Sequence, residues 1–177
     1  LGVLLGDGAL SGDSIRWTNH DPEIADEVGE LVGAGVSVRR NGEGWSIASD
    51  IVGHGHSNPI TSRLREMGVM GKLSFQKEIP EDYLFATIPD RVALLQGLMD
   101  TDGYSGETPE FSSASEKLAR QVVFLVQSLG GTARICCKES PTYTHNGEHR
   151  IGRPSWRVTM SLDNGINPFR LARKASK

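Results

Sequence analysis

The chain contains 177 residues, of which 37% are hydrophobic and 23% charged, and its formal net charge at pH 7 is −3. This composition is typical of a globular protein and excludes a largely disordered chain. No apolar run approaches the roughly 20 residues that a membrane span needs, and no signal peptide is visible, so we expect no membrane partner. The length allows one good core, or two small cores that share an interface.

The chain begins with an apolar segment that ends in Asp-Gly, residues 1–8 (LGVLLGDG). Residues 14–17 predict a short strand, and Asp21-Pro22 opens a helix with the residue types favoured at the N-cap and first helical positions. The apolar stripe of this helix is Ile24, Val28, Leu31 and Val32. Alternating apolar and polar residues then predict two half-buried antiparallel strands, in residues 36–39 and 45–48.

A second copy of this pattern starts about 95 residues later, where residues 96–103 (QGLMDTDG) align with residues 1–8 without a gap. The elements predicted after it repeat the first set: a strand at residues 110–113, a helix capped by Ser115, and strands at residues 132–138 and 155–162. Residues 141–154 are expected to form a long, polar hairpin loop. The sequence therefore predicts a mixed α+β fold of two pseudo-twofold halves, residues 1–86 and 87–177.

Small residues at a spacing of four line one face of each repeated helix. They are Gly2 and Gly6 in the first copy, and Ala93, Gly97 and Thr101 in the second. Such a face lets two helix backbones approach closely. A packed core pair whose helices end at Gly8 and Gly103 would explain these glycines, but it would not explain the aspartates that precede the helix ends.

Asp7 and Asp102 lie just before the ends of the two helices, where the helix dipole is negative and disfavours a carboxylate. Packing the helices together brings the two carboxylates close, and a shared divalent cation would relieve their repulsion. Carboxylate, carbonyl and water ligands suit Mg²⁺, with Mn²⁺ as a substitute, so the carbonyls of Gly6 and Thr101 are further candidate ligands. Two carboxylates around metal ions are suited to phosphodiester hydrolysis. Asp100 breaks the symmetry of the two copies, because Leu5 stands in its place, and we expect it at the surface or behind the ligands.

The repeated segment resembles the signature of the LAGLIDADG homing endonucleases, in particular those carried inside inteins. Residues 95–103 match the nine-residue signature, and residues 1–8 match it from its second position, so the first helix is expected to be truncated. Residues 76–80 (QKEIP) and 167–169 (NPF) extend the similarity. The resemblance implies two αββαββα halves with the signature helices at the centre and saddle-shaped antiparallel sheets over double-stranded DNA. It also implies a monomer that makes a staggered double-strand break at a long target site.

The resemblance further implies basic residues near the carboxylates. Lys77 lies in the block where intein endonucleases place an active-site lysine, 70 residues beyond Asp7. Lys174 lies 72 residues beyond Asp102 and is the corresponding candidate in the second half, although it sits in a basic cluster that solvation alone would explain. Such a lysine would polarise water or stabilise the pentacovalent phosphate.

Charge is segregated along the chain, with seven acids in residues 1–33 and nine bases in residues 134–177. This asymmetry indicates a polyanionic partner, with a solvated basic face as the alternative. The polar phase of the strands is expected to face DNA. The candidate DNA-binding residues on it are Arg16, Arg39, Arg134, Lys138, Arg157 and Thr159, flanked by Arg40 and Arg153. Trp17, Trp45 and Trp156 fall on the buried phase, which argues against stacking on unpaired bases.

Two further motifs carry weaker expectations. Cys136 and Cys137 are adjacent, which is unsuited to a cross-link, and this usage predicts a reducing, cytoplasmic location. His54 and His56 stand in Gly-His-Gly-His with no third ligand at a suitable spacing, so we expect no zinc site there.

Three other functions are alternatives to a metal-dependent DNA endonuclease. A LAGLIDADG protein that binds DNA as a regulator, or RNA as a maturase, needs no pair of acidic ligands, and both Asp7 and Asp102 are present. An enzyme acting on a small substrate would need a phosphate-binding glycine loop or a cofactor motif, and the sequence has neither. Splice-junction residues are also missing, so we expect no protein splicing by this chain.

Overall fold

The computed structural model describes residues 1–51, 58–145, 147–162 and 165–177, and the candidate histidines His54 and His56 lie outside these residues. The first half runs α1 (Gly2–Gly6), β1 (Gly8–Ala9), β2 (Ile15–Trp17), α2 (Pro22–Leu31), β3 (Val36–Asn41), β4 (Gly44–Ser49) and α3 (Pro59–Glu66). The connection carries the short 3₁₀ helix η1 (Ser74–Gln76) and α4 (Glu81–Leu84). Among the described helices, none is long and apolar enough to span a membrane.

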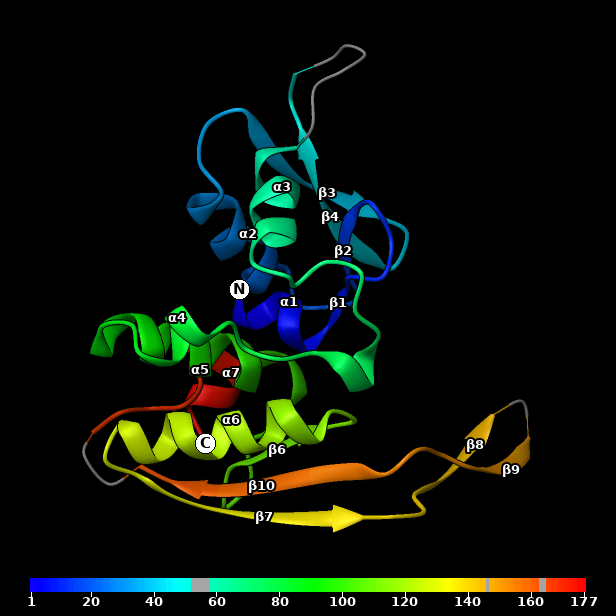
Figure 1. Ribbon diagram of the computed structural model, residues 1–177, viewed down its shortest axis with the longest axis vertical. Coiled ribbons are helices and arrows are strands. Elements are labelled where there is room, and N and C mark those ends of the chain that lie inside the picture. Colours follow the sequence, from blue (N-terminus) through cyan, green and yellow to red (C-terminus); the bar gives the residue numbers. More distant parts are fainter. Residues whose placement is uncertain (52–57, 146, 163–164) are drawn as a thin grey trace.

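The second half repeats this order (Figure 1). It runs α5 (Ile88–Asp102), β5 (Gly103–Tyr104), β6 (Glu110–Ser113), α6 (Glu116–Ser128), β7 (Thr132–Lys138), β10 (Ser155–Ser161) and α7 (Ala172–Ala175), with β8 (Thr142–His145) and β9 (Glu148–Ile151) inserted before β10. The two four-stranded antiparallel sheets have the same strand order, β1-β2-β4-β3 and β5-β6-β10-β7. Each half is therefore αββαββα, and the predicted mixed fold with its internal repeat is confirmed.

The helix starts and stripes follow the sequence patterns with one exception. Ser115 caps α6 as predicted, because its hydroxyl accepts a hydrogen bond from the N–H of Leu118 at 3.1 Å, and Leu118, Val122 and Leu125 are fully buried. In α2, however, Leu31 is 76% exposed. The buried residues of α2 are Ile24 and Ala25, so Leu31 does not lie on the buried face.

The two signature helices, α1 and α5, pack against each other at the centre of the molecule (Figure 1). A Cβ atom on Gly97 would lie 2.9 Å from the backbone nitrogen of Val3, and one on Gly2 would lie 2.4 Å from the carbonyl oxygen of Leu94. The helices therefore touch backbone to backbone, which is the contact that the small-residue spacing predicted. The closeness of the helices fixes the positions of both Asp-Gly ends.

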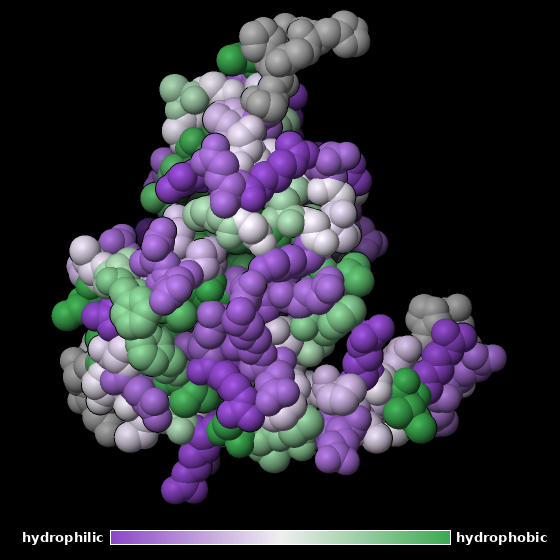
Figure 2. All heavy atoms as spheres, viewed as in Figure 1, coloured by the Kyte–Doolittle hydropathy of each residue, from purple (hydrophilic) through white to green (hydrophobic). Residues whose placement is uncertain are grey.

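The stretch at residues 141–154 is not the long loop that we predicted. It contains β8 and β9, which pair in an antiparallel ribbon with Tyr143 opposite Arg150. Threonine and tyrosine favour extended backbone, and Gly147 has a positive φ of 80° at the turn. The ribbon extends away from the body of the protein beyond the ends of β7 and β10 (Figures 1 and 2).

The C-terminal segment joins the two halves electrostatically. Arg170 forms an ion pair with Glu27 at 2.8 Å, the N–H of Ala172 donates to Glu23 at 3.0 Å, and Arg173 donates to Asp21 from Nε and from one terminal nitrogen of its guanidinium. Asp21 occupies the N-cap position of α2, but its carboxylate binds Arg173 instead of the helix N–H groups. Part of the charge segregation seen in the sequence is therefore satisfied within the chain, and it is weaker support for a polyanionic partner than the sequence alone suggests.

Candidate metal and DNA-cleavage site

The two signature aspartates meet at the C-terminal ends of α1 and α5. Asp7 is the C-cap residue of α1, and Asp102 is the last residue of α5. A Cβ atom on Gly6 would lie 3.5 Å from Oδ2 of Asp102, so this carboxylate lies against the end of the opposite helix. Both side chains are partly buried. The fold therefore brings together the two carboxylates that the repeat singled out.

The surroundings of Asp102 disfavour its charge. Burial and the negative charge of Asp7 together raise the pKa of this carboxyl to about 6, against the opposing effects of Lys77 and Lys174. A proton is therefore retained at slightly acid pH where an ordinary aspartate would be ionised. A bound cation would likewise offset the unfavourable negative charge of Asp102 beside Asp7.

Lys77 reaches this site from the connection between the halves. Its backbone is held by α6, because the Ser115 hydroxyl donates to the Lys77 carbonyl at 2.6 Å, and the side chain of Gln121 bonds both the N–H and the carbonyl of Ile79 at 2.8 Å. The Lys77 ammonium is buried and donates to the carbonyl oxygen of Gly6 at 2.5 Å. Burial lowers its pKa, while the charges of Asp102 and Asp7 oppose that shift. Lys77 therefore lies between the two halves beside both carboxylates.

Lys174 lies at the other side of the α5 terminus. Its ammonium donates to the carbonyl oxygens of Met99, Asp100 and Gly103 at 2.9, 2.8 and 2.6 Å. These three bonds use all the protons of the ammonium. Burial lowers its pKa, and the nearby Arg173 lowers it further. In this structure Lys174 caps the negative end of α5 directly beneath Asp102 and has no proton left to donate.

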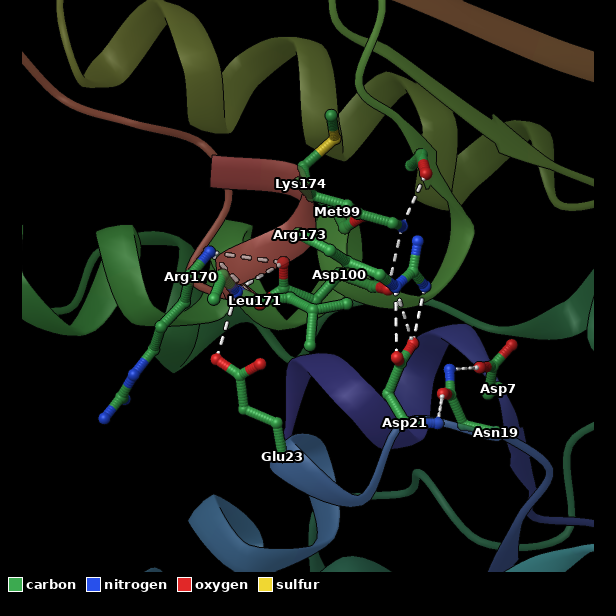
Figure 3. A network of polar contacts seen from close by, with 12 residues as sticks. Asp7, Asn19, Asp21, Glu23, Met99, Asp100, Arg170, Leu171, Arg173 and Lys174 are labelled. Atoms are coloured by element: carbon green, nitrogen blue, oxygen red, sulfur yellow. Dashed lines mark hydrogen bonds and ion pairs between the residues drawn. The ribbon is translucent and has the colours of Figure 1, made fainter. Parts of the chain in front are cut away.

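Asp100 was expected either at the surface or behind the ligands, and it is buried, so the first alternative is wrong. Its carboxylate accepts hydrogen bonds from the N–H groups of Arg170 and Leu171 at 3.1 to 3.2 Å. Burial raises its pKa, and these two backbone bonds oppose the shift. Asp100 thus fastens the C-terminal segment to α5 and places Lys174 (Figure 3). In the sequence, the only sign of this role is that Asp100 breaks the symmetry of the two copies. Leu5 stands at the matching position in the first half, where there is no C-terminal segment to hold.

A polar cavity of about 250 Å³ opens beside Lys77 and Asp102. Its other lining residues come from the end of α1, from η1 and from β6 and the start of β10, namely Leu5, Gly6, Ser74, Ser112, Ser113, Ala114 and Ser155. Four of the residues that line the cavity are therefore serines. The cavity has room for several water molecules.

The donor atoms at the helix ends fit a hard divalent cation. Within the described part of the chain, no group of three or more histidine, cysteine, aspartate or glutamate side chains gathers in one place, so a dedicated all-protein cage is missing. Mg²⁺ commonly binds through one or two carboxylates and keeps several waters for exchange with phosphate oxygens. Asp7 and Asp102 supply that number of carboxylates. One candidate carbonyl ligand, the Gly6 oxygen, accepts a hydrogen bond from Lys77. The other candidate residue is Thr101, whose side-chain hydroxyl donates to the carbonyls of Gly97 and Leu98.

The outward face of the first sheet carries Arg16 and Arg39 on one row. Both lie opposite Ser46 of β4, so their side chains share a face. Arg39 is exposed and paired with Asp50 at 2.9 Å. Exposed ion pairs of this kind contribute little stability. A phosphate can therefore replace the Asp50 carboxylate at a small cost in free energy.

The outward face of the second sheet carries the remaining predicted strand residues. Arg134 lies opposite Thr159, and Arg157 opposite Cys136, while Lys138 pairs with Ser155 on the same phase. The sequence interpretation overlooked Glu110, which lies opposite Thr159 on this face and pairs with Arg157 at 3.2 Å. This face is therefore less basic than the list of arginines implies.

The two flanking arginines sit against aromatic rings. Arg40 lies 4.9 Å from the centre of the Trp45 ring, which shares its strand face. Arg153 lies 4.2 Å from the ring of Phe75 in η1, next to the cavity beside Lys77. Trp17 is fully buried as predicted, whereas Trp45 and Trp156 are only half-buried.

The metal-free protein is expected to lose stability as the pH rises from about 4 to about 6. The folded state holds the Asp102 proton more tightly than the unfolded chain, because its pKa rises from 3.8 to about 6, and stability from a raised carboxyl pKa is lost as that group ionises. Asp102→Asn should therefore be the more stable protein above pH 6, by on the order of 2 to 3 kcal/mol. Urea unfolding in EDTA at pH 4.5 and 7 measures this difference, and an equal difference at the two pH values would contradict it.

Comparison with known proteins gives a family match to part of the chain and a fold match to nearly all of it. Residues 90–158 match the family described as LAGLIDADG-like domain. Among curated proteins, the replicative DNA helicase DnaB of Synechocystis sp. is 29% identical over 188 residues and that of Mycobacterium intracellulare 29% over 177. These matches take in 96% and 99% of this chain but only 20% and 25% of the helicases.

Among solved structures, a variant of the homing endonuclease I-DmoI aligns with 99% of this chain and 92% of its own at a TM-score of 0.57 and 14% identity. The same enzyme in complex with DNA and Ca aligns at a TM-score of 0.56 and 13% identity. The likeness establishes that this chain has the fold of that endonuclease.

Proposed function

We propose that this chain is a LAGLIDADG-type homing endonuclease that cleaves both strands of a double-stranded DNA target with divalent metal ions. The observation that carries the proposal is the meeting of Asp7 and Asp102 at the close-packed ends of α1 and α5, with the buried ammonium of Lys77 beside them. The match of residues 90–158 to the LAGLIDADG-like domain supports it. The complex of I-DmoI with DNA and Ca supplies a precedent for this fold on DNA with a divalent ion.

Asp7 and Asp102 would hold Mg²⁺, or Mn²⁺ in its place, at the junction of the two halves. A bound divalent ion supplies an activated water and neutralises charge on the phosphate. The Lys77 ammonium donates to the Gly6 carbonyl beside the two carboxylates, and there it would be available to a phosphate oxygen of bound DNA. Positive charge at that point stabilises the extra negative charge of the pentacovalent state. Lys174 acts by neutralising the end of α5, because its protons are committed to carbonyl oxygens.

The two outward sheet faces would hold the DNA on either side of this centre. Arg16 and Arg39 on the first sheet and Arg134, Lys138 and Arg157 on the second are placed to contact phosphates or guanine edges. Two of these arginines, Arg39 and Arg157, already pair with a carboxylate, Asp50 and Glu110 respectively, whose place a DNA phosphate would take. The chain would bind DNA as a monomer, since its internal repeat provides both half-sites.

We further propose that the chain is of the intein-carried type. The chain spans about a quarter or less of the DnaB relatives, and the sequence has no phosphate-binding glycine loop of the kind that a helicase motor uses. The shared segment is thus better explained as an endonuclease inserted into those proteins than as part of their motor.

The activity is tested with a plasmid library that carries candidate insertion sites, including DnaB coding sequences. The protein with Mg²⁺ should linearise a small subset of plasmids at one position each, and EDTA should abolish this. Tight, salt-sensitive DNA binding without any cutting in Mg²⁺ or Mn²⁺ would overturn the endonuclease proposal and favour a non-cleaving DNA-binding regulator. Preferential binding to RNA would favour a maturase.

A further inference from the structure

We propose that Asn19 is a positioning residue that fixes the carboxylate of Asp7, and that the two carboxylates are therefore unequal as metal ligands. The inference rests on the proposed function and assigns a role to a residue that no sequence motif singled out. The side-chain amide of Asn19 donates to Oδ2 of Asp7 at 2.8 Å. Among the residues that the structure describes, no side-chain donor holds Asp102 in this way, and this difference between the halves is the basis of the proposal.

Three polar atoms of Asn19, the two of its side-chain amide and its backbone carbonyl oxygen, have partners that limit its movement. Its side-chain oxygen accepts from the N–H of Asp21 at 2.9 Å, and its backbone carbonyl accepts from the indole N–H of Trp45 at 3.1 Å. Because the N–H of Asp21 can only donate, the amide oxygen must face it and the amide nitrogen must face Asp7. The orientation of the donor towards Asp7 is therefore set by the backbone.

The turn at Asn19 also contacts the C-terminal segment. Asp21 bonds Arg173 (Figure 3), and this bond lowers the pKa of the Asp21 carboxyl and keeps it charged. Arg173 is adjacent to Lys174, which caps α5 below Asp102. A continuous polar network thus runs from the Asp7 ligand to the end of the opposite helix.

Ser113 is the equivalent of Asn19 in the second half. Trp17 pairs with Gly8 and Phe111 pairs with Gly103, so the residues two positions further on occupy matching places. The match extends to the turn. The Ser113 hydroxyl accepts a hydrogen bond at 3.1 Å from the N–H of Ser115, which is the N-cap residue of α6. The turn is present in both halves, but only Asn19 has a second polar side-chain atom, its amide nitrogen, that can bond outside the turn.

The shorter serine leaves Asp102 without a side-chain donor. Across the described residues, no hydrogen bond to the Asp102 carboxylate is found, although Asp102 and Ser113 both line the cavity of about 250 Å³. Asp7 is thus held in one orientation before metal binds, whereas Asp102 must be oriented by water, metal or DNA. Groups that orient a metal ligand from behind change metal affinity or activity by about 10- to 100-fold.

Asn19→Ser separates the two roles of the residue. Serine keeps the turn to Asp21, as Ser113 does in the other half, but it removes the donor to Asp7. We expect Mn²⁺ affinity, measured from the EPR signal of free Mn²⁺ during titration of the free protein, to fall about 10- to 100-fold. On a target duplex labelled separately on its two strands, we expect one strand to be slowed more than the other, so that nicked DNA accumulates.

Asn58→Ser is the matched control in the same half. Asn58 also accepts a backbone N–H two residues on, from Ile60 at 2.9 Å, and its amide donates to the carbonyl of Ile47 at 3.0 Å, away from the carboxylates. This variant should leave Mn²⁺ affinity and both strand rates unchanged. Unchanged Mn²⁺ affinity in Asn19→Ser, or weaker affinity with equal slowing of both strands, would overturn the proposal. If the wild-type protein cuts no DNA, the endonuclease proposal fails, and the Mn²⁺ titration alone decides the role of Asn19.

Discussion

Asp7→Asn and Asp102→Asn are each expected to reduce DNA cleavage on the order of 10³-fold or more while leaving DNA binding intact. Asparagine keeps the shape of aspartate but loses the charge that a divalent cation requires, and metal supplies most of the charge stabilisation in phosphodiester hydrolysis. Because each change removes a negative charge from a site that faces phosphates, binding should be equal or tighter. This combination separates a lost metal ligand from a lost fold.

The measurement is single-turnover cleavage of the cognate duplex in Mg²⁺, with binding followed in Ca²⁺. Asp13→Asn is the matched control, since Asp13 is an exposed aspartate that pairs only with Arg65 on the surface of the first half. It should cleave at the wild-type rate. Near-normal cleavage by either ligand variant would show that the carboxylates at the helix ends are structural and would remove the main support for the endonuclease.

Gly97→Ala is expected to destabilise the protein by about 2 to 3 kcal/mol, although alanine favours helix. The added Cβ atom would lie 2.9 Å from the backbone nitrogen of Val3 and 3.1 Å from Cα of Gly2. Backbone atoms cannot rotate aside, so α1 and α5 must separate. Gly97→Leu should prevent stable folding, because the side chain has no space between the helices.

Gly29→Ala is the opposing control for the same change. Gly29 also lies within a helix, α2, but a Cβ atom there would have its nearest neighbour 4.0 Å away, at Val38. Helix propensity then dominates, and this variant should be more stable than wild type by about 0.5 to 1 kcal/mol. Urea unfolding of the two variants compares them directly. Equal stability of the two would mean that the central helices tolerate separation, and it would weaken the argument that their contact positions the site.

The repeat, the fold and the two aspartates could be predicted from the sequence because each depends on local pattern. Alternation and helix periodicity identify strands and helices wherever one face is buried, and the gapless match of residues 1–8 with residues 96–103 identifies the symmetry. The small-residue spacing at Gly2 and Gly97 predicted the close helix contact for the same reason. Lys77 could be named only through the family resemblance, since a lone lysine carries no pattern.

Other features depend on contacts between segments far apart in the chain, which a local pattern does not record. Tertiary structure alone pairs Arg173 with Asp21 and Arg157 with Glu110, and so reduces the basic surface that the charge count predicted. It buries Asp100 under the C-terminal segment and commits the ammonium of Lys174 to the end of α5. It also sets Asn19 against Asp7, a bond between residues whose separation in sequence carries no periodic signal. The sequence by itself identified the candidate metal-binding groups through the repeat, and the packing of the two halves decided how each of those groups is held.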